Sequence, residues 1–208
     1  MEKKITEIVF ILDRSGSMEG LTEDTIGGFN SLIKEHKEDD GTVLISTVLF
    51  NQFSELIHDR IDIKDVPKMT RKDYKAFGST ALIDALGETI TNIDMIQKHL
   101  RKEDVPQKTL FVITTDGMEN SSVKYTSDEV KKMVKKKTKK GWDFIFLAAN
   151  IDAVETAKNY GIDERFAANY VADKEGMQKR RDVTSRVMEM AICGGVITED
   201  WKDGLEDK

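Results

Sequence analysis

Short apolar runs alternate with longer amphipathic stretches along most of this chain, and that alternation restricts the fold more than any other feature. Four runs have the compact apolar character of buried parallel strands: 8–12, 42–50, 108–114 and 142–149. A further edge strand is predicted at 166–171. Helices are predicted at 25–37, 81–100, 126–141, 154–160 and 176–193, where apolar residues recur at helical spacing.

The segment 52–63 reads as another strand, but it follows 42–50 too closely for a crossover helix. It must therefore pair antiparallel with its predecessor. The sequence predicts an α/β fold: a doubly wound, Rossmann-like, mostly parallel six-stranded sheet with one antiparallel strand and helices on both faces.

No linker divides the 208 residues, which include only two prolines. This length suits one domain with a buried core. We expect a single domain over 1–195 and a solvated acidic tail over 196–208.

Composition excludes several classes of protein. The net charge of −6 argues against nucleic-acid binding, and the lysines of 131–140 are expected on the solvated face of a helix. No apolar run reaches the ~20 residues needed to span a bilayer. Cys193 is the only cysteine, so an internal disulfide is excluded, and we expect it in the core. The first residues lack a signal-peptide pattern, and a cytoplasmic protein is expected.

Acidic and hydroxyl residues follow two of the predicted strands. Asp13, Ser15 and Ser17 come directly after the first, within Asp-Arg-Ser-Gly-Ser, and Asp116 follows the strand at 108–114 within Thr-Thr-Asp-Gly. Thr80 precedes the helix at 81–100, within Gly-Ser-Thr. In a doubly wound sheet these segments meet beyond the carboxyl ends of the strands. Two carboxylates and three hydroxyls, without histidine or thiol, favour a hard cation such as Mg²⁺, with Mn²⁺ or Ca²⁺ also fitting.

These residues, in this order, resemble the metal-ion-dependent adhesion site of von Willebrand factor A (vWA) domains, and the likeness covers roughly residues 5–193. The resemblance implies that Ser15 and Ser17 bind the metal directly, and Thr80 directly or through water. Asp13 and Asp116 would act directly or through bridging waters. All five positions match, so the site is expected to be intact.

The resemblance also implies a function. A partner protein's Asp or Glu carboxylate would complete the coordination of the metal, without catalysis. Bacterial intracellular relatives often work beside ATPases or in assembly systems, so such a component is the expected partner. Some relatives couple metal coordination to a shift of the last helix, which is 176–193 in this chain.

The loops expected to select the partner contain Arg14, Met18 and Glu19, the Asn51–Gln52 turn, and residues 118–120 and 150–152.

Two other readings of the site stay open. A phosphatase of the haloacid dehalogenase type also begins with an Asp after its first strand, but it needs a second acidic residue two positions on, where this chain has Ser15. A structural metal-binding module without a metal-bridged partner is the non-enzymatic alternative. An EF-hand loop is rejected because Met18 stands where that loop needs glycine.

Overall fold

A six-stranded sheet forms the centre of the molecule in the computed structural model, which describes residues 4–205. The strand order is β3-β2-β1-β4-β5-β6. All neighbours pair in parallel except β2 and β3, which are antiparallel. The strands are β1 (Ile5–Asp13), β2 (Thr42–Phe50), β3 (Ser54–Asp62), β4 (Lys108–Thr115), β5 (Trp142–Ala148) and β6 (Ala167–Asn169). The predicted fold class is confirmed.

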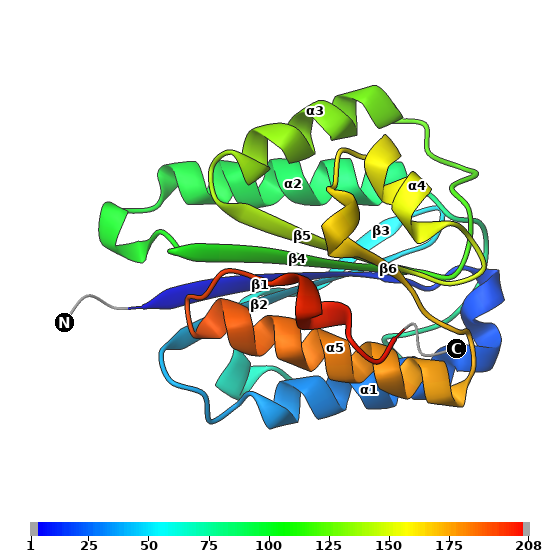
Figure 1. The fold of residues 1–208 in the computed structure, drawn as a ribbon, viewed down its shortest axis with the longest axis horizontal. Coiled ribbons are helices and arrows are strands. Elements are labelled where there is room, and N and C mark those ends of the chain that lie inside the picture. The colour runs from blue at the N-terminus through cyan, green and yellow to red at the C-terminus, as the bar shows by residue number, and fades with distance from the viewer. Residues whose placement is uncertain (1–3, 206–208) are drawn as a thin grey trace.

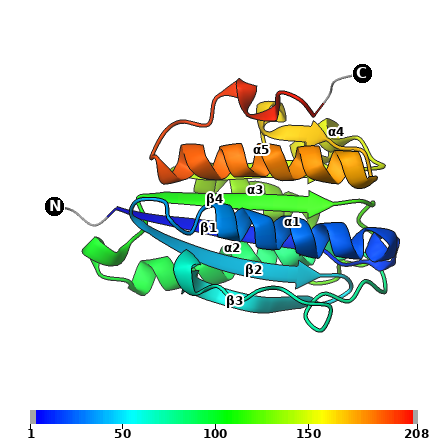
Figure 2. The same ribbon diagram turned by 90° about the horizontal axis from the view of Figure 1, so that it is seen from below.

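Five α-helices cover the two faces of the sheet within the described residues. Figures 1 and 2 show α1 and α5 on one face, and α2, α3 and α4 on the other. Their bounds are α1 (Thr22–Glu35), α2 (Leu82–His99), α3 (Ser127–Thr138), α4 (Ala153–Asn159) and α5 (Lys174–Ile192). Each predicted helix is present, with ends that differ by a few residues.

The central strand β1 shows why the sheet needs both helical layers. All nine of its residues are buried, and successive side chains point to opposite faces. Ile8, Phe10 and Leu12 join the apolar core with α1 and α5. Val9 and Ile11 join a second core with α2, α3 and α4. Because both faces are apolar, neither can remain in water.

Local signals define where several helices begin. The Thr126 hydroxyl accepts from the Glu129 amide at the start of α3, and the Glu129 carboxylate accepts from the Thr126 amide. This reciprocal pair of hydrogen bonds is a capping box. The Asp173 carboxylate caps α5 in a similar way by accepting from the Gly176 amide.

The segment after α5 is not the solvated tail that its acidic composition suggested. Ile197, Trp201 and Leu205 are buried in the core beside α5, and the Trp201 indole donates to the Arg165 carbonyl at 2.8 Å. The polar residues Glu199 and Lys202 lie on the same short 3₁₀ helix, Glu199–Lys202. This segment is buried because of the spacing of its apolar residues, which its acidic average composition did not reveal. Residues 206–208 of the predicted tail lie outside the described residues, and the domain boundary stays a prediction.

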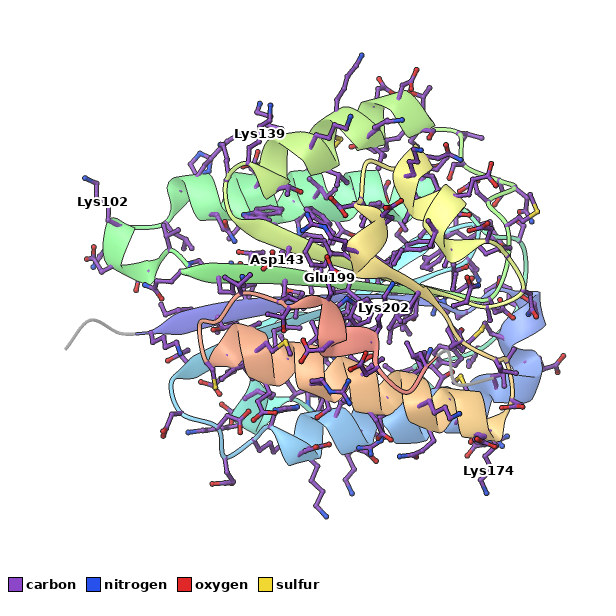
Figure 3. All side chains as sticks on the ribbon, in the orientation of Figure 1. Lys102, Lys139, Asp143, Lys174, Glu199 and Lys202 are labelled. Atoms are coloured by element: carbon purple, nitrogen blue, oxygen red, sulfur yellow. The ribbon has the colours of Figure 1, made fainter. Side chains whose placement is uncertain are left out.

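Two single-residue expectations are also wrong. Cys193 is exposed because it lies at the C-terminal cap of α5, past the face that packs on the sheet. Lys139 is exposed as expected (Figure 3), but Lys137 of the same run is buried. Lys137 forms an ion pair with Asp94 and lies 4.7 Å from the centre of the Trp142 ring.

No helix among residues 4–205 has both the length and the apolar character that crossing a membrane requires.

Candidate metal centre

The predicted site residues lie at the carboxyl edge of the sheet, where β1 and β4 are neighbours. Leu12 pairs with Thr114 in the parallel register, so the residues that follow the two strands leave the sheet side by side. Asp13 ends β1, and Asp116 comes directly after β4. The sheet order therefore brings two segments about 100 residues apart in sequence to one place.

Three of the five predicted ligands form a continuous chain of oxygen atoms. The Ser15 and Ser17 hydroxyl oxygens are 3.1 Å apart, and the Ser17 hydroxyl donates to Asp116 Oδ1 at 2.6 Å. Ser15 and Asp116 are buried, whereas Ser17 is exposed. This cluster therefore has a buried base and one side open to solvent.

Asp13 lies behind this cluster and is held on both carboxylate oxygens. Its Oδ1 accepts from the Ser15 amide at 2.7 Å, and its Oδ2 accepts from the Thr115 hydroxyl at 2.6 Å. Burial raises the pKa of Asp13, while the hydrogen bonds from Thr115 and Ser15 act in the opposite direction. A cation nearby would favour the charged form of this carboxylate.

Thr80 reaches the same edge on the loop before α2. A hydrogen bond joins that loop to the loop after β1: the Gly16 amide donates to the Gly78 carbonyl at 3.0 Å. Gly78 has φ +79°, which strains any residue with a side chain, and a Cβ there would also displace the Gln52 side chain, whose Oε1 would lie 1.8 Å away. Thr80 itself is buried; its amide donates to the Asn120 side-chain oxygen and its carbonyl accepts from the Asn120 amide, both at 2.9 Å. The structure thus brings all five predicted residues, from three segments of the chain, to one edge, although the Thr80 hydroxyl makes no hydrogen bond to the other four side chains.

Residues that the sequence did not single out support the site from below. The Tyr74 hydroxyl donates to the Asp13 carbonyl at 2.5 Å, and the Tyr170 hydroxyl donates to the Thr115 carbonyl at 3.2 Å. Burial raises the pKa of both tyrosines, so their hydroxyls remain protonated donors. Thr115 is buried completely. No local pattern identifies these residues, because each role depends on a contact with a distant segment.

Two further acidic residues hold the loop after Asp116 against the start of α2. Asp84, in the first turn of that helix, accepts three backbone amides, from Val123, Lys124 and Tyr125. Glu119 accepts three more, from Ile83, Ser121 and Ser122. The sequence offered one indication of a role for Asp84, which is its position as an acidic residue in the first turn of a predicted helix.

The burial of the predicted partner-contact residues divides them into two groups. Met18 and Asn51 are buried, and Arg14 is 7% exposed with its guanidinium paired to Glu55 at 2.7 Å. These residues shape the loops from inside, so the expectation that they contact a partner is wrong for Met18 and Asn51. Met118 is 73% exposed and can contact a partner.

The oxygen-only donor set favours a hard cation. Across residues 4–205, no three His, Cys, Asp or Glu side chains gather in a way that could hold a metal ion. A metal at this edge would therefore depend on two carboxylates and on hydroxyl oxygens, which suit Mg²⁺, Mn²⁺ or Ca²⁺ better than softer ions.

Two comparisons by sequence were negative. No protein-family model matches the chain. No curated protein matches it either.

Comparison by structure finds similar chains at low sequence identity. Proximal thread matrix protein 1 from the mussel byssus, with a zinc-occupied MIDAS motif, has a TM-score of 0.61 at 13% identity, over 89% of this chain and 46% of that one. This chain thus spans about half the length of the mussel protein. The vWF domain of the type V pili tip protein from Porphyromonas gingivalis has a TM-score of 0.65 at 10% identity, over 95% of this chain and 99% of that domain.

A third similar structure is the manganese-loaded TRAP protein of Plasmodium vivax, with a TM-score of 0.57 at 16% identity, over 84% of this chain and 70% of that one. Identities this low establish the architecture alone. The sheet order, the single antiparallel strand and these likenesses agree, and the chain has the Rossmann-like fold of a von Willebrand factor A domain.

Proposed function

We propose that this chain is a divalent-metal-dependent protein-binding domain, in which an Asp or Glu carboxylate of a partner completes the coordination of Mg²⁺. The observation that carries the proposal is the oxygen cluster of Ser15, Ser17 and Asp116, linked at 3.1 and 2.6 Å, in which Ser17 is exposed to solvent. Zinc in the mussel structure and manganese in the Plasmodium structure support a divalent metal. Mg²⁺ in this chain is inferred from the oxygen-only donors.

Each side chain has a distinct role in this proposal. The Ser15 and Ser17 hydroxyls would hold the ion as weak neutral ligands, Thr80 would bind it directly or through water, and Asp13 and Asp116 would balance its charge directly or through bridging waters. When bound, Mg²⁺ supplies an electrophilic centre that can exchange water for a carboxylate oxygen. Because Ser17 is exposed, the partner's carboxylate would approach from its side of the cluster.

Exposed apolar side chains on the surrounding loops support a protein as the ligand. We call Phe53, Phe77 and Met118 the rim; they are 68%, 48% and 73% exposed. Asn51 joins the two aromatic loops, because its amide donates to the Phe53 carbonyl at 3.0 Å and its side chain to the Phe77 carbonyl at 3.1 Å. Met118 follows Asp116 by two residues. Protein interfaces are enriched in aromatic residues and methionine.

The partner class follows from the same surface. An acidic protein of net charge −6 is poorly suited to nucleic acid, and a carboxylate flanked by apolar residues fits both the cluster and the rim. We propose a protein partner, such as an ATPase or a component of an assembly system, with binding as its role and no catalysis.

A pull-down with matched variants tests this function. Wild type, Asp116→Ala and the control Asp128→Ala, which changes an exposed carboxylate at the start of α3, would each be used with Mg²⁺ and with EDTA. We expect one protein to be retained by wild type and by the control in Mg²⁺ only, and lost with Asp116→Ala.

The rim gives a second readout in the same experiment. Met118→Ser should weaken capture of that protein while Mg²⁺ binding stays unchanged, because Met118 is not in the donor set. Capture that ignores both EDTA and Asp116→Ala would contradict a metal-bridged contact. Metal binding that stabilises the fold without any metal-dependent capture would favour the structural role instead.

A further inference from the structure

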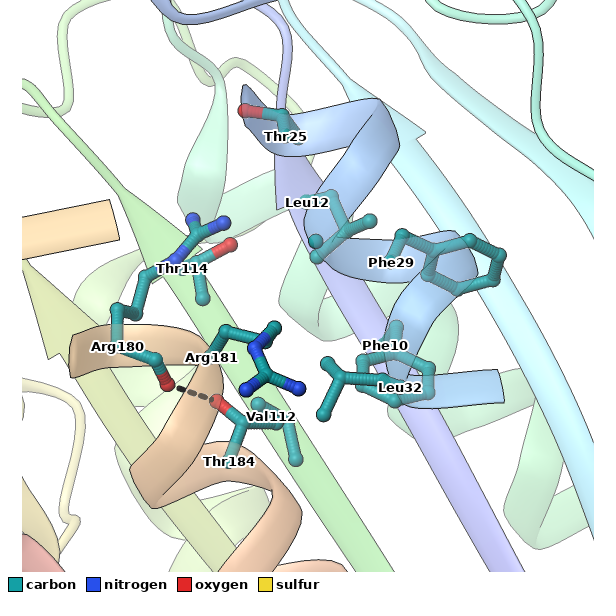
Figure 4. Close-up of a pocket in the computed structure, with 11 residues that line it drawn as sticks. Phe10, Leu12, Thr25, Phe29, Leu32, Val112, Thr114, Arg180, Arg181 and Thr184 are labelled. Carbon is teal, nitrogen blue, oxygen red and sulfur yellow. Dashed lines mark hydrogen bonds between the residues drawn. The ribbon is translucent and has the colours of Figure 1, made fainter. Parts of the chain in front are cut away.

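A small cavity lies between α1, α5 and the strands β1 and β4. Its volume is about 20 Å³, and Figure 4 shows the residues that line it. Apolar side chains such as Phe10, Leu32 and Val112 form most of its wall. The polar groups come from the threonines and arginines of the same lining, and two of them already have partners.

Two of these polar groups are accounted for by hydrogen bonds and ion pairs. The Thr184 hydroxyl donates to the Arg180 carbonyl at 2.8 Å, the contact drawn in Figure 4. The Arg181 guanidinium lies 3.0 Å from a Glu35 carboxylate oxygen and also pairs with Asp182. Neither residue needs a further ligand.

Arg180 and Thr25 differ from the rest of the lining. Their side chains are 94% and 98% buried, since they are 6% and 2% exposed. Arg180 Nη1 and Thr25 Oγ1 are both buried atoms with no hydrogen-bond partner within residues 4–205. No carboxylate of the described residues pairs with Arg180. Two unpartnered polar groups, one from α5 and one from α1, therefore line a single cavity.

The Arg180 charge needs a counter-charge. An arginine cannot lose its proton in a protein, and a buried charge without a partner is strongly unfavourable. The Tyr170 ring, 5.3 Å from the guanidinium carbon, stabilises the cation in part. Tyr170 carries no negative charge that could balance the guanidinium.

We propose that this cavity binds one monovalent anion of halide size, which in the cell would be chloride, held by Arg180 Nη1 and the Thr25 hydroxyl. One water-sized ligand needs about 10–15 Å³, so a cavity of about 20 Å³ suits a single small ion such as chloride. A water molecule would satisfy the two donors, but it would leave the charge of Arg180 unbalanced. The anion would link α1 to α5 beneath the sheet edge that carries the candidate metal centre.

Thermal unfolding in EDTA tests the proposal without involving the metal. Sodium chloride would be compared with sodium gluconate at constant ionic strength. Saturating chloride should raise the wild-type Tm by about 2–4 °C over gluconate, a shift typical of modest ligand linkage in a protein of this size. Bromide should act like chloride.

Matched variants place the effect in the cavity. Arg180→Met should abolish the chloride response, and Thr25→Val should reduce it. Lys179→Met is the control: it removes a positive charge from the neighbouring position of α5, where Lys179 pairs with Glu175, and should keep the full response. If Arg180→Met does not fold, the chloride response of Thr25→Val compared with that of the wild type still tests the proposal.

Crystals grown in bromide give the direct observation. An anomalous bromide peak beside Arg180 Nη1 and Thr25 Oγ1 is the expected result. The proposal is overturned if that position holds only water and the Tm ignores halide. It is equally overturned if Arg180→Met responds to chloride as strongly as the wild type, because the anion would then bind elsewhere.

Discussion

Hydroxyl groups determine the arrangement of the candidate metal centre at the scale of single residues. The Asp13 carboxylate is oriented by the Thr115 hydroxyl at 2.6 Å, and Asp116 by the Ser17 hydroxyl at 2.6 Å. A ligand that is fixed in advance loses less freedom when it binds. Thr115 would therefore act on the metal through Asp13 without touching it.

Replacing Thr115 with valine tests that role. The buried Asp13 carboxylate would lose one hydrogen bond, and the free energy of unfolding should fall by about 1–3 kcal/mol. Mg²⁺ affinity should fall about 10- to 100-fold, as it does when a supporting residue around a metal is removed. Urea unfolding and calorimetry measure the two effects.

Thr138→Val is a suitable control for this substitution. Its hydroxyl donates to the Val134 carbonyl within α3, far from the sheet edge, so neither quantity should change by much. If Thr115→Val bound Mg²⁺ as the wild type does, Asp13 would not need that hydroxyl for its orientation.

At the scale of elements, the antiparallel strand β3 carries a buried histidine. His58 is 4% exposed, its Nδ1 is 3.0 Å from the Thr47 hydroxyl oxygen on β2, and its ring stacks on Phe29 with centroids 5.7 Å apart. Burial lowers the pKa of His58 below its ordinary value of 6.5. The unfolded chain therefore binds a proton more readily than the folded one.

This difference predicts how stability depends on pH. As the pH falls below about 6.5, the unfolded state takes up protons first, so the free energy of unfolding should decrease, by at most about 1.4 kcal/mol per pH unit from this residue. His58→Asn should be less stable at pH 8 but show a weaker decrease between pH 7 and 5. The exposed His99 provides the control, because His99→Asn should keep the wild-type slope. Equal slopes for all three proteins in urea titrations would contradict the prediction.

The segment after α5 is a second element whose stability can be tested. Trp201 is completely buried, and the Arg186 guanidinium donates to the carbonyls of Asp200, Trp201 and Asp203. Trp201→Ala should cost about 3–5 kcal/mol, the usual price of truncating a buried aromatic residue. Val196→Ser, at an 80% exposed position, should cost little in the same urea experiment. A small cost for Trp201→Ala would mean that this segment is not part of the core.

At the scale of the whole molecule, the sequence predicted what depends on local periodicity and missed what depends on distant contacts. Strands β1 to β5 and the five helices follow from runs of apolar residues and capping signals. Asp13 and Asp116 could be placed together because parallel strands leave a sheet on the same side. The roles of Tyr74 and Arg180 could not be predicted, since the residues that surround them come from elements far apart in sequence.

The tail shows the same limit on a larger scale. Its acidic composition predicted solvation, but three apolar residues at intervals of four bury the segment beside α5. Composition averages over neighbours, whereas packing depends on which face each residue occupies. The fold class was therefore predictable, and the extent of the core was not.

The central claim, that Ser15 and Ser17 hold a divalent metal, is tested most directly by Mg²⁺ and Mn²⁺ calorimetry on wild type and Ser15→Ala/Ser17→Ala, with circular dichroism to confirm that both proteins are folded. We predict that wild type binds one ion and that the folded double mutant binds none. Unchanged binding in the double mutant would mean that the ion is held elsewhere, and would contradict the assignment of this metal centre.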